Sequence, residues 1–363
     1  MKKTLIFFCF LALSTGLTAQ LDTIIHDGQA RSYILHVPPG YDEDSFHPLV
    51  INMHGLGSNA AQQQFYSQFN LVADTADIIV AYPNGLDNTW NIAFDFGVDD
   101  VGFIAALIDT LSDMYSIDAS RVYATGMSMG GFMSHRLGCQ LNDKIAAIAS
   151  VTGTLAYPGC DPGRPFPVMQ IHGTADSTVP YLLVPPTMGV WISQNDCLDT
   201  ATMDLPDIDT TDQCTVTKSI YSPCDEDVEV VLYTINGGGH TWPGAPIEIG
   251  ITNYDIDASV EIWNFFRQYV LPEYVGVFAV SEPAGQLHIY PQPAYEGVTL
   301  ELPDMVNERA EIRIYDLSGR MVYRESQLIR QNIRMKRNGL LPGIYVVEIS
   351  SAGYHARGKL IFR

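Results

Sequence analysis

A serine between two glycines is the first residue whose type and setting suggest chemistry. Gly126-Met127-Ser128-Met129-Gly130 is a GxSxG pattern that follows an apolar run and precedes a helical pattern. The glycines permit a tight turn that presents the serine hydroxyl, and the following helix directs its positive N-terminus at the same place. A plain glycine turn is the alternative, but the position between strand and helix favours a nucleophile.

A nucleophilic serine needs a base and an orienting acid, because a free serine hydroxyl is a poor nucleophile. On a sheet of this type they follow in the order Ser, Asp, His. Asp176 lies just beyond the apolar run 168–171, and His240 lies in a glycine loop beyond the run 228–235. The sequence therefore predicts a catalytic triad of Ser128, Asp176 and His240. An ordinary turn aspartate and a structural histidine are the alternatives for the last two.

The negative charge that develops on a substrate oxygen must be held by backbone N–H groups. Met53-His54-Gly55-Leu56-Gly57 ends the first central strand, and its glycines let N–H groups turn towards the serine. We expect the N–H groups of Leu56 and Met129 to form this oxyanion hole, although the residues leave Gly55 open as the donor in place of Leu56. His54 is expected to brace the loop, because its partner acid would be out of order for a base.

Three aromatic side chains flank the predicted catalytic loops. Trp242 lies two residues after His240, and Trp90 and Tyr181 lie in or beside other loops of the same edge. We expect all three to bind substrate by stacking on an aromatic or sugar ring, with packing inside the protein as the alternative. The chemistry requires no metal and no organic cofactor. The aspartate-rich stretch 196–227 lacks the glycine and terminal glutamate of a calcium loop, so we expect a solvated acidic insertion there.

The elements that must position these residues alternate between strand and helix patterns. Short apolar, β-branched runs are typical of strands buried on both faces. The alternation predicts an α/β fold in which helices cover both faces of a mostly parallel sheet, and ligands of such sheets bind where the strands end. The expected strands are residues 48–52, 77–81, 122–125, 146–151, 168–171 and 228–235, and the expected helices are 101–115, 130–141 and 258–270.

Composition and charge divide the 363 residues into segments. Residues 1–19 have the positive start, apolar stretch and small residues of a signal peptide. Residues 20–274 contain 7 Lys and Arg against 32 Asp and Glu, whereas residues 275–363 contain 11 against 9. This asymmetry indicates two modules, which we expect at 20–274 and 287–363 with a linker at 275–286. The net charge of −21 argues against nucleic-acid partners, and beyond the signal peptide no apolar run is long enough for a membrane span.

Four blocks of the larger module resemble a known family. Residues 99–103, 121–131, 172–181 and 238–244 are similar to the secreted esterases of the polyhydroxybutyrate-depolymerase type, which include feruloyl and acetylxylan esterases. The resemblance implies an α/β-hydrolase fold and a serine esterase that forms an acyl-enzyme, with feruloyl or acetyl esters of plant polysaccharide as substrates. A polyhydroxyalkanoate (polyester) depolymerase is the alternative, and a serine peptidase is a more distant one. Met129 stands where the family most often has Asn.

The tail resembles a different family. Residues 287–293, 312–320, 340–347 and 359–363 are similar to the C-terminal sorting domain of the type IX secretion system of Bacteroidetes. The resemblance implies a small all-β sandwich, handling by the type IX secretion machinery, and a secreted or cell-surface location. Without it, a carbohydrate-binding module would be the expectation.

Five cysteines remain after the signal peptide, so one thiol should be unpaired. The esterase resemblance supports Cys139 with Cys160 and Cys197 with Cys224, because cysteines near these places recur in that family. Cys214 is then the odd thiol, although the residues alone allow it to compete with Cys224 for Cys197.

Overall fold

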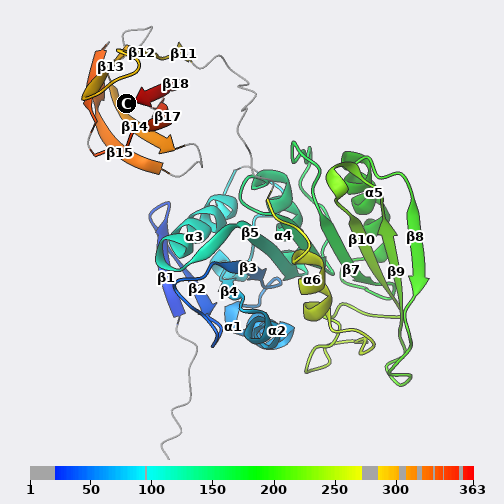
Figure 1. Ribbon diagram of the computed structural model, residues 1–363. Coiled ribbons are helices and arrows are strands. Elements are labelled where there is room, and N and C mark those ends of the chain that lie inside the picture. Colours follow the sequence, from blue (N-terminus) through cyan, green and yellow to red (C-terminus); the bar gives the residue numbers. More distant parts are fainter. Residues whose placement is uncertain are drawn as a thin grey trace, which may run out of the picture. The chain divides into compact units, whose positions relative to one another are not determined.

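The structure is a computed structural model, and it describes residues 21–94, 96–271, 285–301, 308–316, 321–329, 332–337, 339–350 and 355–363 (Figure 1). The chain divides into two compact units, Met1–Glu273 and Tyr274–Arg363. The expected signal peptide and residues 275–284 of the expected linker lie outside the described residues. Gly285–Gln286 form strand β11, so the strands of the second unit begin two residues earlier than the linker prediction allows.

The described part of the first unit is built on a ten-stranded sheet with the order β1-β2-β4-β3-β5-β6-β7-β10-β9-β8. The neighbours from β4 to β10 are parallel, and the two strands at each edge are antiparallel. This confirms the predicted α/β class. The strands are β1 (Leu21–His26), β2 (Gln29–His36), β3 (His47–Met53), β4 (Ile79–Pro83), β5 (Ile117–Met127), β6 (Ala147–Val151), β7 (Val168–Gly173), β8 (Thr200–Asp204), β9 (Thr215–Tyr221) and β10 (Val230–Asn236).

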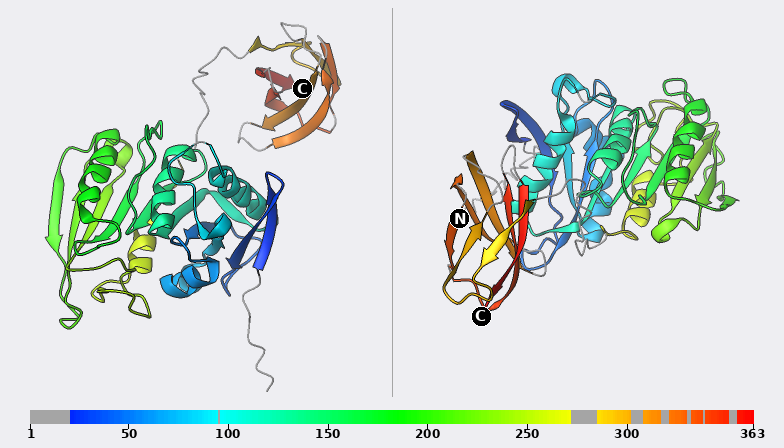
Figure 2. Two further views of the ribbon diagram at one scale, coloured as in Figure 1. Left: turned by 180° about the vertical axis from the view of Figure 1, so that it is seen from behind. Right: turned by 90° about the horizontal axis from the view of Figure 1, so that it is seen from above.

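Helices cover both faces of this sheet (Figure 2). One hydrophobic core lies under α1 (Ala60–Ser67), α2 (Phe69–Ala76) and α6 (Ala258–Phe266). The other lies under α3 (Asp100–Met114), α4 (Met129–Gln140) and α5 (Val184–Gln194). Strands β3, β4, β6 and β7 are buried along their whole length, which explains why they are nearly continuous apolar runs. Short 3₁₀ helices occupy Leu86–Asn88, Tyr181–Leu183 and Asp225–Asp227.

The acidic insertion, which the sequence predicted to be solvated, contains two strands that the sequence did not predict. Its strand β9 pairs with β10, and β8 pairs with β9, so the insertion extends the sheet at one edge. Every residue of β8 is exposed. Its sequence, TATMD, lacks the continuous β-branched apolar run by which the other strands were predicted.

Two disulfides close loops of the first unit. Cys139–Cys160 joins the end of α4 to the loop after β6, and Cys197–Cys224 joins the segment after α5 to the one before β10. These are the two pairs that the resemblance implied. Cys214 is a buried free thiol, and burial raises its pKa to about 11. A thiol protonated at neutral pH is a poor nucleophile.

The described strands of the second unit form a five-stranded sheet, β11-β18-β17-β14-β15, and a three-stranded sheet, β12-β13-β16. A separate hydrophobic core holds the unit together, with Ile314, Val347 and Leu360 fully buried. This confirms the predicted small β domain. Its strands are β12 (His288–Tyr290), β13 (Gly297–Glu301), β14 (Glu308–Asp316), β15 (Met321–Ile329), β16 (Asn332–Lys336), β17 (Gly343–Ser350) and β18 (His355–Phe362).

Among the residues that the structure describes, none of the helices has both the length and the apolar character needed to cross a membrane.

Candidate active site

Ser128 occupies a strained turn between β5 and α4. Its backbone has φ 53° and ψ −118°, a region that residues with a side chain rarely adopt. A Cβ atom on Gly130 would lie 2.1 Å from the carbonyl oxygen of Met53, and one on Gly126 would lie 2.5 Å from the same atom. Only glycine at both positions lets the end of β3 pass so close to the turn. The Ser128 N–H donates to Val151 O at 2.8 Å, which ties the turn to the neighbouring strand β6.

Asp176 and His240 come together from the loops after β7 and β10. His240 Nδ1 lies 2.7 Å from Asp176 Oδ2, and Asp176 Oδ1 accepts the N–H groups of Thr178 and Val179, each at 2.8 Å. Burial alone would raise the pKa of Asp176, but the donors from His172, His240 and Val179 hold that pKa well below its usual range. Asp176 is therefore an ionised, oriented acceptor for the His240 ring.

The sheet order brings Ser128 to the same edge as this pair. Its strand β5 is followed across the sheet by β6, β7 and β10, all parallel, so their carboxyl ends lie along one side. The structure brings Asp176 and His240 into contact, but it forms no hydrogen bond between the hydroxyl of Ser128 and any described residue, His240 included. Catalytic hydrogen bonds of this kind often tighten only in the complex with substrate.

The loop after β3 borders Ser128. A Cβ atom on Gly55 would lie 3.3 Å from Ser128 Cβ, so glycine allows this close approach. Within the described residues, the N–H groups of Gly55, Leu56 and Met129 donate to no acceptor. They are available to a developing oxyanion, and Gly55 remains an alternative to Leu56.

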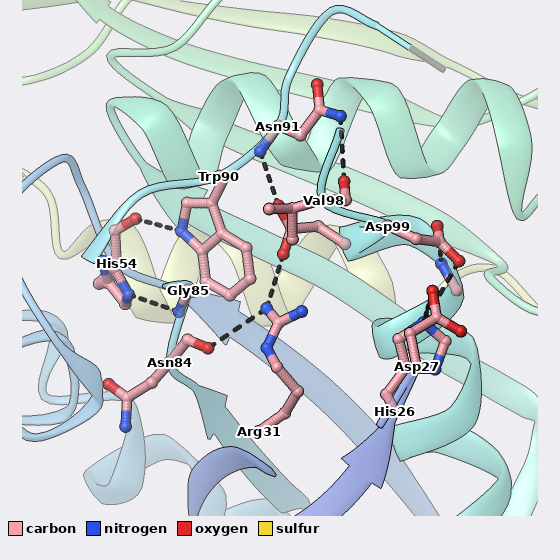
Figure 3. A network of polar contacts seen from close by, with 12 residues as sticks. His26, Asp27, Arg31, His54, Asn84, Gly85, Trp90, Asn91, Val98 and Asp99 are labelled. Atoms are coloured by element: carbon pink, nitrogen blue, oxygen red, sulfur yellow. Dashed lines mark hydrogen bonds and ion pairs between the residues drawn. The ribbon is translucent and has the colours of Figure 1, made fainter. Parts of the chain in front are cut away.

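His54 braces this loop, as the sequence suggested (Figure 3). Its Nε2 accepts the N–H of Gly85 at 3.0 Å, and its Nδ1 donates to the carbonyl of Gly55 at 2.7 Å. Burial lowers the pKa of His54, which favours the neutral ring that these two bonds require. The Gly55 carbonyl and the Leu56 N–H belong to one planar peptide unit, so His54 also fixes the direction of that N–H.

A buried ion pair holds the segment that contacts His54 (Figure 3). Arg31 donates to Asp100 Oδ1 at 2.6 Å, and the N–H of Asn91 donates to the other carboxylate oxygen at 2.7 Å. The neighbouring Trp90 donates its indole N–H to His54 O at 2.9 Å. Arg31 and Asn91 were not predicted from the sequence, whereas Asp100 lies in one of the resembling blocks, residues 99–103.

Two of the three expected substrate-binding aromatics are core residues. Trp242 is 1% exposed and donates its indole N–H to Ser259 Oγ, and Trp90 is 3% exposed. The prediction that they stack on substrate is wrong, because neither indole has surface left for a ligand. Tyr181 is partly exposed and bonds through its hydroxyl to Thr234, so its role remains a prediction.

A pocket of about 610 Å³ lies beside α4, the helix that follows Ser128. It is bounded by Phe132 of α4, the loop after β6 and residues of α5. The N–H of Phe132 donates to Ser128 O at 2.9 Å. Most of the pocket lining is apolar or aromatic, including Phe132, Leu155, Tyr157, Leu183, Pro186 and Val190. None of these residues was predicted from the sequence to bind substrate.

The chain is similar to known esterases and, in its tail, to a secretion sorting domain. The family described as Esterase PHB depolymerase matches residues 31–176, and the Secretion system C-terminal sorting domain matches residues 288–363. Feruloyl esterase C of Emericella nidulans is 31% identical, over 65% of this chain and 83% of that protein. Putative esterase NocK of Nocardia uniformis is 30% identical, over 65% and 79% respectively.

Other similarities are partial. Feruloyl esterase B of Piromyces equi is 31% identical over 67% of this chain, but the chain spans only 46% of its length. The acetyl xylan esterase from Aspergillus awamori superposes with a TM-score of 0.50 at 16% identity, over 61% of this chain and 94% of that one, which shows the fold alone. The chain therefore belongs to the esterase family of the polyhydroxybutyrate-depolymerase type, and it ends in a type IX sorting domain that directs it to the cell surface or beyond.

Proposed function

We propose that this chain hydrolyses carboxylic esters through an acyl-enzyme on Ser128. The observation that carries the proposal is the 2.7 Å contact between Asp176 Oδ2 and His240 Nδ1, at the sheet edge where Ser128 lies in a strained strand-to-helix turn. With Nδ1 donating to the carboxylate, the neutral ring has its free electron pair on Nε2. His240 is then set to accept the proton of a serine hydroxyl.

In the first half-reaction Ser128 Oγ attacks the ester carbonyl while His240 Nε2 takes its proton. The tetrahedral intermediate collapses, His240 returns the proton to the alcohol oxygen, and the acyl group remains on the serine. The N–H groups of Leu56 and Met129 hold the oxyanion, and each donor of this type contributes about 3 kcal/mol to the transition state. Water, deprotonated by His240, then releases the acid and restores the hydroxyl.

Feruloyl or acetyl esters of plant polysaccharide are the proposed substrates. Relatives named feruloyl esterase support the first acyl group, and the apolar pocket next to the helix of Ser128 is large enough for an aromatic ring. The charge of residues 20–274, with 32 acidic against 7 basic side chains, favours neutral over anionic polymers. Polyhydroxybutyrate is also neutral, so polyester hydrolysis remains the second candidate.

A serine peptidase is disfavoured by the chain itself. Peptidases on this kind of sheet restrict access with a large extra domain, but the segment between Ser128 and Asp176 holds only α4, β6, β7 and their connecting loops. A panel of chromogenic peptides that is cleaved faster than simple esters would reverse this choice.

The proposal is tested by Ser128→Ala, with Ser112→Ala on the exposed side of α3 as the matched control. We expect hydrolysis of 4-nitrophenyl acetate to fall by about 10⁴-fold or more in the first variant and to stay unchanged in the second. Parallel turnover of methyl ferulate, acetylated xylan and polyhydroxybutyrate film then separates the substrates. Retained activity in Ser128→Ala refutes the nucleophile, and clearing of the film without release of ferulate or acetate refutes the substrate class.

A further inference from the structure

A row of fully buried polar side chains extends from the catalytic pair into the core, and the mechanism above does not use it. Trp191 of α5, His135 of α4, and Gln170 and His172 of β7 each have an exposure of 0%. A polar group buried without a hydrogen-bond partner destabilises the fold, so these four side chains must have partners that compensate for their burial.

The partners fix the direction of every hydrogen bond in the row. The indole N–H of Trp191 can only donate, so Nδ1 of His135 accepts it at 3.0 Å and the proton of the neutral ring lies on Nε2. That Nε2–H donates to Gln170 Oε1 at 2.9 Å. The amide nitrogen of Gln170 then faces the carbonyl of Gly153 at 2.9 Å, which can only accept, and this fixes the orientation of the amide.

The last link in the row is His172. The same amide nitrogen of Gln170 lies 3.2 Å from Nδ1 of His172 and 3.3 Å from Ile171 O, and it cannot accept a proton from Nδ1, so the proton of His172 lies on Nε2. That nitrogen lies 2.8 Å from Val179 O and 3.4 Å from Asp176 Oδ2. All the donors therefore point the same way along the row, towards the carboxylate of Asp176.

Both oxygens of Asp176 are consequently held. Oδ1 accepts the N–H groups of Thr178 and Val179, while Oδ2 lies between His240 at 2.7 Å and His172 at 3.4 Å. Because His172 also bonds the carbonyl of Val179, it fixes the segment whose N–H binds the opposite oxygen. The carboxylate cannot rotate away from His240 without losing several of these contacts.

We propose that His172 is a positioning residue that orients Asp176 towards His240, and that Trp191, His135 and Gln170 hold His172 in the Nε2–H tautomer that this requires. The inference rests on the proposed function, since it assigns a task to a residue behind the same site. A histidine whose contacts do not reach Asp176, either directly or through Val179, could be equally buried, but its replacement would leave turnover unchanged.

The first test compares His172→Leu with His172→Gln, which keeps a side-chain N–H donor. For His172→Leu we expect kcat to fall about 10- to 100-fold with KM within about twofold of the original, the size of a lost bond to a charged group. His172→Gln should recover most of the loss. His47→Leu is the matched control, because His47 is also a buried histidine bonded to a backbone carbonyl, and its kcat should not change. A kcat for His172→Leu within twofold of the original, or equal losses in the two variants, overturns the proposal.

The second test uses the original chain, so it does not depend on how well the variants fold. It also does not require the enzyme to be active. Long-range ¹H–¹⁵N correlation spectra of the full chain report the tautomer of each histidine ring. We expect the spectra to show the Nε2–H tautomer for both His135 and His172. An Nδ1–H tautomer at His172 overturns the inference even if esters are hydrolysed. Absence of ester hydrolysis in the original chain would instead refute the proposed function, and the spectra remain readable in that case.

Discussion

His135 should make the esterase unit sensitive to mild acid. Its side chain is fully buried, and its Nδ1 already accepts the indole N–H of Trp191, so a proton added there would bring two N–H groups face to face. Burial lowers the pKa of His135 to about 4, compared with about 6.5 for a histidine in an unfolded chain.

The sign and size of the effect follow from this difference in pKa. As the pH falls below about 6.5 the unfolded chain takes up a proton at this position, whereas the folded chain does so only near pH 4. Each pH unit between these values favours the unfolded state by about 1.4 kcal/mol. His135 therefore makes its full contribution to the free energy of unfolding above pH 6.5. That contribution decreases on acidification, and the total loss is about 3 kcal/mol near pH 4.

Urea unfolding followed by tryptophan fluorescence can measure this loss. The four tryptophans, Trp90, Trp191, Trp242 and Trp263, all lie in the first unit, so the signal reports that unit alone. Between about pH 7 and pH 5 the original chain should lose about 2 kcal/mol more than His135→Gln, which cannot titrate. The pKa of His54 is also lowered by burial, but His54 is present in both proteins and cancels. Equal pH slopes for the two proteins would refute the reasoning.

Two further predictions concern stability. Replacing both Cys139 and Cys160 by alanine opens a loop with a sequence separation of 21, and the free energy of unfolding in urea should fall by about 3 kcal/mol; an unchanged midpoint would show that this bridge does not stabilise the fold. Arg31→Met leaves the carboxylate of Asp100 buried and unpaired, so we expect a loss of about 3 to 5 kcal/mol that a simultaneous Asp100→Leu partly restores. Equal Tm values for the single and double variants would contradict that account.

The central sheet could be predicted because its strands are buried on both faces. Residues 48–52 and 168–171 are apolar runs, and they lie within β3 and β7. Strand β8 has no buried residue and β1 has only half-buried ones, so neither strand is a continuous apolar run. Their place in the sheet depends on backbone pairing, of β8 with β9 and of β1 with β2. The pattern of apolar residues in the sequence does not report this pairing.

The predicted pair of Asp176 and His240 rested on chain order, which sheet topology determines. The aromatics were predicted from nearness in sequence, which does not determine the direction of a side chain. Trp242 lies two residues from His240, yet its indole turns into the core and donates to Ser259 of α6. An indole buries much more apolar surface inside than it could against a ligand, and the core is therefore its usual place.

His172 shows which part of a site a single sequence can still reveal. Gln170 and His172 are two residues apart on β7, so they project from the same face of the sheet. A polar pair on a strand that is otherwise apolar and buried implies partners on the helices that cover that face, because unpaired groups there would destabilise the fold. The identity of those partners depends on how α4 and α5 pack, which brings His135, 35 residues away in sequence, to Gln170 and brings Trp191 to His135. The sequence can thus indicate that buried polar residues lie next to Asp176. The direction of their hydrogen bonds follows only from the packing of the helices.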